Sequence, residues 1–162
     1  MDHRRSSYKA KFRHQVAAGR NALLVLTGLT LINLVLLICK ANYHFLISAA
    51  VPYYLNWICV KLGAAWIWRV LAALLAIGLV GFYGFCWLQS HRRRIFLTAA
   101  LGAYGLDTLL LLIFTFTLVE EPASCVLEIL THLAVLGLLV VADQAAGAMQ
   151  RIRSRAKAME PV

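Results

Sequence analysis

Four long runs of apolar residues dominate the pattern along the chain, and short polar or basic stretches separate most of them. The runs cover about residues 21–39, 66–88, 95–119 and 124–146. Each run reaches the ~20 residues that a helix needs to cross a hydrocarbon core about 30 Å thick. The pattern therefore predicts an all-α fold, a polytopic membrane protein built as a four-transmembrane-helix bundle.

A fifth apolar stretch, residues 43–62, lies between the first two runs but carries His44, Pro52 and Asn56. Pro52 has no N–H group and would kink a long helix. A fifth span would also place the basic turn 92–94 outside, against the positive-inside rule. We therefore expect an interfacial or re-entrant segment here. Its aromatic residues form either an interfacial belt or a gate over a cavity, and the gate would be made of Pro52, Tyr53 and Tyr54.

Composition supports the membrane interpretation and a single domain. The chain has 162 residues, of which 62% are hydrophobic and 14% charged, and a soluble domain of this length cannot bury so much apolar surface. Most of the 16 basic residues lie in segments 1–20, 92–94 and 151–157. With four spans these segments share one side, which predicts that both termini are cytoplasmic in an inner or plasma membrane.

The same pattern divides the chain into three parts. We expect a cytoplasmic basic amino-terminal segment at 1–20, a single transmembrane domain at 21–148 and a cytoplasmic basic tail at 149–162. The net charge of +9 is explained by topology, so we predict contact with anionic lipid and no binding of nucleic acid. The expected lipid contacts are Arg92, Arg93, Arg94, Arg151, Arg153 and Arg155.

Asp107 is the strongest sign of function, because it lies near the middle of the third span. A carboxylate at that depth is costly unless it is protonated, paired or hydrated, so it marks a site by default. Counting ~1.5 Å per residue places the other polar groups by depth. We predict an ion- or ligand-binding set with a middle layer and an outer layer. The set consists of Asn33, Arg69, Asp107, Glu128 and His132.

Some of these groups also have structural interpretations. Asp107 could tie helices together through a hydrogen bond, and Arg69 with Glu128 could form an ion pair at the span ends. Glu128 and His132 are four residues apart and share one helix face, with Asp143 further along that face. We expect Asp143 to be a solvated charge at a helix end. We predict neither a metal nor a cofactor, because two ligands do not make a stable metal site.

Three functional hypotheses follow. The first is handling of an ion or small solute by a transporter, channel or membrane subunit, which would work as a homo-oligomer or with a partner membrane subunit. The second is a structural or regulatory membrane protein whose buried charges fix helix packing. The third is a membrane thiol-redox enzyme: the chain resembles quinone-coupled disulfide-forming enzymes in size, but its 4 cysteines contain no C-x-x-C motif. The absence of other enzyme motifs favours a protein that is not an enzyme.

Overall fold

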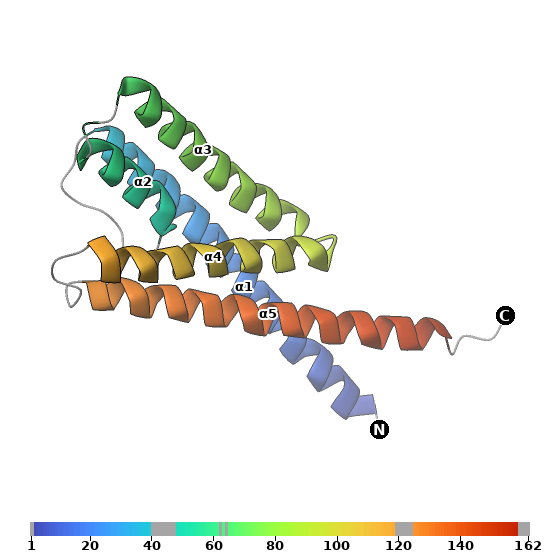
Figure 1. Cartoon of the computed structure of the whole chain (residues 1–162). Coiled ribbons are helices and arrows are strands. Elements are labelled where there is room, and N and C mark those ends of the chain that lie inside the picture. Colours follow the sequence, from blue (N-terminus) through green and yellow to red (C-terminus); the bar gives the residue numbers. More distant parts are fainter. Residues whose placement is uncertain (1, 40–47, 62, 64, 119–124, 159–162) are drawn as a thin grey trace.

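The computed structural model describes residues 2–39, 48–61, 63, 65–118 and 125–158, and these ranges contain five helices and no strand. This arrangement confirms the predicted all-α fold (Figure 1). The helices are α1 (Asp2–Ile38), α2 (Ala50–Lys61), α3 (Trp66–Gln89), α4 (Arg94–Leu118) and α5 (Val126–Ala158).

The surface of the bundle is apolar and its interior contains the polar groups. Four helices, all except α2, are long and apolar enough to cross a membrane. Large apolar side chains such as Leu74, Leu106 and Leu130 are exposed on them. Asp107, His132 and several hydroxyl groups are buried instead. This distribution matches a lipid solvent and not water, so the chain is a multi-pass membrane protein.

Two helices extend well beyond the expected spans. Helix α1 begins at Asp2 and α5 continues to Ala158, although the apolar windows within them are Ala10–Leu36 and Val126–Ile152. Hydropathy marks the part of a helix that lies in lipid, whereas the flanking Lys, Arg, Ala and Gln residues are good helix formers in water. Both extensions lie on the side of the α3–α4 turn (Figure 1). The expected span ends at residues 119 and 124 are outside the described residues.

Helix α2 is a half-helix that re-enters the bundle. Its 12 residues rise only about 18 Å, too short to cross the hydrocarbon core. It begins beside the middle of α4, and its other end lies with the end of α1 and the start of α3 (Figure 1). The segment between the first two spans is therefore re-entrant. Residues 43–47 and 62 of the predicted segment lie outside the described part.

Two clusters of apolar side chains hold the helices together. The larger cluster joins α1, α3, α4 and α5, and includes Leu26, Tyr83, Tyr104 and Leu139. The smaller cluster lies under α2, where Ala50 and Tyr54 meet Leu111, and Phe114 and Ile129 pack beside them. The half-helix thus packs mainly against α3 and α4, and the small cluster around Ala50 and Tyr54 attaches it to α4.

Helices α1 and α5 cross closely at Gly19. A methyl group added at this glycine would overlap the Cβ atom of Ala142 and would also approach the carbonyl oxygen of Leu138. Close approach of two transmembrane backbones is the usual reason for a small residue at a helix interface. The crossing fixes where the two extended helices separate.

We predict that Gly19→Ala lowers the free energy of unfolding by about 1–3 kcal/mol, because it overfills this contact. Gly28 of the same helix is the matched control, since nothing lies within 4 Å of an added Cβ there. Gly28→Ala should be neutral or slightly stabilising, because alanine is the better helix former. Thermal unfolding in detergent compares the two variants. Equal stability of the two would contradict the proposed crossing.

Candidate functional site

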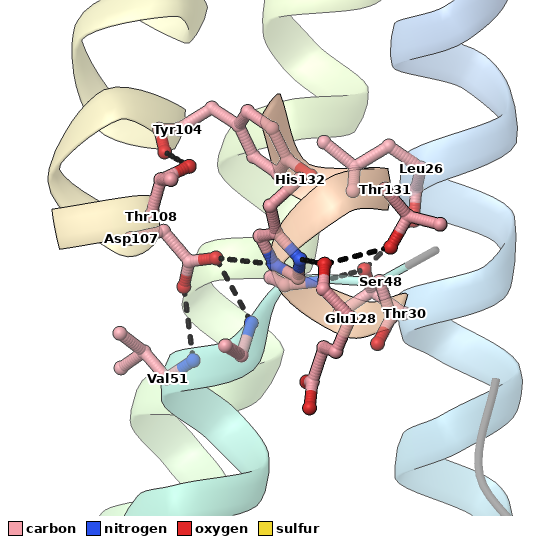
Figure 2. A network of polar contacts seen from close by, with 12 residues as sticks. Leu26, Thr30, Ser48, Val51, Tyr104, Asp107, Thr108, Glu128, Thr131 and His132 are labelled. Atoms are coloured by element: carbon pink, nitrogen blue, oxygen red, sulfur yellow. Dashed lines mark hydrogen bonds and ion pairs between the residues drawn. The ribbon is translucent and has the colours of Figure 1, made fainter. Parts of the chain in front are cut away.

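The start of α2 lies inside the bundle, and a carboxylate from α4 binds it (Figure 2). The backbone N–H of Ala50 donates to Oδ2 of Asp107 at 2.9 Å, and that of Val51 donates to Oδ1 at 2.9 Å. Asp107 is only 2% exposed. The first turn of a helix has N–H groups without partners within the helix and carries a partial positive charge. A carboxylate is therefore the group that this helix end stabilises best.

The remaining donors of this helix end are also accounted for. The N–H of Ala49, the residue before α2, donates to Oγ1 of Thr30 at 2.9 Å. Pro52 has no N–H to satisfy, and proline is tolerated in the first turn of a helix. Just upstream, Nδ2 of Asn33 donates to Oγ of Ser48 at 2.7 Å. Side chains of α1 and α4 therefore satisfy the buried backbone donors that an end inside a membrane would otherwise leave unpaired.

The sequence favours this arrangement at each contributing position. Ser48, Ala49 and Ala50 are small, so the backbone can approach α1 and α4 closely. The hydroxyl of Thr30 donates to the carbonyl of Leu26 at 2.7 Å, which leaves an oxygen lone pair for Ala49. Threonine can hold both roles within a helix because its hydroxyl is donor and acceptor at once.

His132 of α5 completes the site. Its Nε2 lies 3.5 Å from Oδ2 of Asp107, an ion-pair distance and not a short hydrogen bond. Its Nδ1 lies 2.9 Å from the carbonyl oxygen of Glu128. The imidazole also stacks on the ring of Tyr104, with ring centroids 5.4 Å apart and planes 5° apart. The ring is fully buried and held on three sides.

These contacts define where protons can be in the site. A carbonyl oxygen only accepts, so Nδ1 of His132 must carry a hydrogen. Nε2 then faces a carboxylate oxygen, and two acceptors repel each other unless one proton lies on either of them. Both oxygens of Asp107 already accept backbone N–H groups, and Oδ2 is the oxygen that faces Nε2. Nε2 and Oδ2 can therefore share one proton, and both side chains are buried.

The structure gathers four of the five predicted site residues around the start of α2. Asn33, Asp107 and His132 contribute side chains to the network. Glu128 contributes its carbonyl oxygen to His132, and its carboxylate points away from the pair (Figure 2). Arg69 does not join the group, because its side chain is exposed on the first turn of α3. Arg69 is in neither of the two ion pairs found between described residues, which are Arg94–Asp143 and His132–Asp107.

The three residues predicted to form a gate all belong to α2. Pro52 and Tyr54 are buried, and the Tyr54 ring packs on Phe114 of α4 with centroids 5.4 Å apart. The side chain of Tyr53 lies outside the described part of the structure. The helix that these residues share is directly attached to Asp107, so any movement of α2 would change the environment of the carboxylate.

Sequence reasoning missed the partners of this site. Thr30, Ser48 and Tyr104 are common residue types in apolar helices, and no spacing singles them out. Tyr83 and Tyr104 also place buried hydroxyl groups in the core without a hydrogen-bond partner among the described residues. A signal that could have located the start of α2 is Pro52, because proline is tolerated in the first turn of a helix.

Asp143 differs from its predicted role as a solvated charge. It is buried and forms a bidentate ion pair with Arg94, with Nε to Oδ1 at 3.0 Å and Nη2 to Oδ2 at 2.5 Å. Thr98 donates to Oδ1 at 2.6 Å. Gly147 leaves room for the guanidinium group, which an added Cβ would approach to 2.6 Å. The expectation was wrong because depth alone does not reveal a partner from another helix.

The described residues contain neither a disulfide nor a group of side chains arranged as a metal site. Cys39, Cys59, Cys86 and Cys125 are thiols, and none of them forms a disulfide in the described structure. No group of three or more His, Cys, Asp or Glu side chains within the described ranges is arranged to hold a metal ion. Comparison of the chain with protein families, curated proteins and solved structures found no match.

We predict that Asp107→Ala releases the start of α2. Loss of the carboxylate leaves two buried N–H groups unpaired, each costing about 1–3 kcal/mol, so the free energy of unfolding should fall by about 2–5 kcal/mol. Amide hydrogen exchange at Ala50 and Val51 should become at least ~100-fold faster.

The matched control is Thr117→Val, an exposed position of the same helix whose hydroxyl bonds only within its own turn. This variant should keep the exchange rates of α2. Unchanged protection of Ala50 and Val51 in Asp107→Ala would contradict the role of Asp107 as the partner of the half-helix.

Proposed function

We propose that the protein handles a small ion or solute in the membrane, with a proton on the Asp107–His132 pair as the coupling charge. The observation that carries this proposal is the meeting of a titratable pair with a helix end in the middle of the bundle. Transporters place their binding sites near the bilayer midplane, at the ends of broken helices. Buried ionisable residues in spans commonly serve as proton relays.

The electrostatics of the pair support coupling between a proton and α2. With the shared proton on Nε2, the helix end and the imidazolium would stabilise the Asp107 carboxylate together. Transfer of the proton from Nε2 to Oδ2 would neutralise both groups and weaken the attraction between Asp107 and the N–H groups of Ala50 and Val51. The binding of α2 therefore depends on where this one proton lies.

Helix α2 is placed to act as the gate. It covers the site from the side where α1 ends and α3 begins. It packs on α3 and α4, and its contacts with α4 include the Asp107 hydrogen bonds and the small cluster around Tyr54. This cluster is far smaller than the core that joins the four long helices. Release of Asp107 would remove the hydrogen bonds that join the first turn of α2 to α4 and would leave its packing on α3 and α4. Movement of α2 would then open the carboxylate to that side.

A second candidate is the structural role, in which Asp107 only anchors the half-helix. The observation in its favour is that both carboxylate oxygens are already satisfied by backbone donors. The two candidates differ in what happens when the charge is removed without loss of the fold. A structural anchor affects stability alone, whereas a coupling site affects transport in a protein that remains folded.

The proposed topology places both termini in the cytoplasm of a cell with an inner or plasma membrane. Its support is the charge pattern, since the basic segments lie at the end of the bundle where α1 and α5 extend. A single bundle of four spans is small for alternating access, so we include a homo-oligomer or a partner membrane subunit in the proposal. Arg69 stays a predicted contact for an anion at the opposite end.

The test uses purified protein in lipid vesicles with a pH-sensitive dye inside. A panel of H⁺, Na⁺, K⁺, Cl⁻ and small amino acids is offered under a pH gradient or a membrane potential. We expect movement of at least one of them with the wild-type protein. Asp107→Asn and His132→Gln should reduce it at least tenfold while thermal unfolding shows folded protein. The control for loss of a buried carboxylate elsewhere is the double variant Arg94→Gln with Asp143→Asn. It removes a buried acid together with its ion-pair partner, and it should retain transport.

Two results would refute the transport proposal. One is the absence of any movement above that of protein-free vesicles across the whole panel. The other is transport that Asp107→Asn and His132→Gln leave unchanged. Loss of stability in these variants with unchanged transport would assign Asp107 to the structural role.

A further inference from the structure

A second polar region lies at the opposite end of the bundle from α2. It is a cavity of about 750 Å³ bounded by the α3–α4 turn, the first turns of α4, and the facing parts of α1 and α5. The turn contributes Ser90, His91, Arg92 and Arg93, and α4 begins with Arg94. This cavity shares no residue with the Asp107 site.

The charges around this cavity do not balance. Arg94 is paired with Asp143, and none of the residues that line the cavity is acidic. Arg92 and Arg93 are exposed in the turn, and their backbone N–H groups both donate to the carbonyl of Gln89. The turn is thus folded by its backbone, and no ion pair between described residues involves either guanidinium group. Two arginines at the cavity are available to an anion.

A third cation strengthens this positive region. Arg20 of α1 reaches the turn, where its Nε donates to Oγ of Ser90 at 3.1 Å and its Nη1 lies 3.1 Å from Nδ1 of His91. Neither partner is an acid, so the charge of Arg20 stays uncompensated by these contacts. The turn is therefore held against α1 by a residue that adds positive charge beside the cavity.

The other walls of the cavity are mainly apolar, and Thr98 and Gln150 are their polar members. Val16 of α1, Ile95 and Leu97 of α4, and Met149 of α5 line it. These residues lie at or near the ends of the membrane-crossing parts of their helices, where headgroups meet acyl chains. Ile95 is 66% exposed, so the apolar wall continues onto the lipid-facing surface. A ligand that fits carries an anionic group at one end and a hydrocarbon chain at the other.

We propose that this cavity binds the phosphate headgroup of an anionic glycerophospholipid. Arg92 and Arg93 contact the phosphate, and the acyl chain follows the apolar surface from Ile95 along α4. Basic pockets between transmembrane helices are known sites for anionic headgroups, and guanidinium groups match phosphate oxygens in pairs. The proposal is independent of transport and of the Asp107 site.

The test compares two double variants that remove the same charge on the same side of the bundle. Arg92→Gln with Arg93→Gln changes the cavity. Lys11→Gln with Arg13→Gln changes two exposed basic residues that do not line it. Each protein, in neutral detergent, is titrated with phosphatidylglycerol, with phosphatidylcholine of the same chains, and with inorganic phosphate, and its thermal unfolding midpoint is recorded.

We expect phosphatidylglycerol to raise the midpoint by several degrees in the wild type and in the Lys11/Arg13 variant. The lipid concentration at half-saturation should be at least tenfold higher in the Arg92/Arg93 variant. Phosphatidylcholine should have little effect. If both double variants lost the effect of phosphatidylglycerol equally, the lipid would be attracted by the overall surface charge and not by a specific site. That result would overturn the proposal. So would equal effects of the two lipids, or an effect of inorganic phosphate as large as that of phosphatidylglycerol.

Discussion

The contact between Asp107 and the first N–H groups of α2 is the constraint on which the rest of the structure depends. A chain that turns back inside a membrane exposes backbone donors where no water can satisfy them. Here each donor of the helix end has a partner from another helix, or is absent because the residue is proline. The half-helix therefore exists because α1 and α4 supply the acceptors at the required depth.

The same contact explains why a costly carboxylate is retained in an apolar span. The positive end of α2 and the imidazole of His132 replace the water that Asp107 would otherwise need. Tyr104 and Glu128 then fix the imidazole on its remaining sides. Structure and proposed function thus use one arrangement, because the charge that holds the half-helix is also the charge that a proton can cancel.

Much of the fold could be predicted from hydropathy, because lipid imposes both span length and an apolar exterior. The depth estimate brought Asn33, Asp107 and His132 into one layer, and the structure places them together. Depth alone could not indicate rotation about the helix axis. Arg69 was expected beside Glu128 in the outer layer, and its side chain is exposed. The partner of Asp143 was missed for a related reason, since Arg94 reaches it from a different helix. The backbone donors at Ala50 and Val51 carry no signal in the sequence.

The most direct test is a solid-state NMR distance between the carboxyl carbon of Asp107 and the amide nitrogen of Val51 in lipid bilayers. Protein labelled with ¹³C-aspartate and ¹⁵N-valine is compared with the Val51→Ala variant, which lacks the label at that amide. The N···O distance of 2.9 Å predicts a carbon–nitrogen distance of about 4 Å. Dipolar dephasing at that distance, lost in the variant, would support the account. Identical dephasing in the two proteins would show that Asp107 does not hold the half-helix.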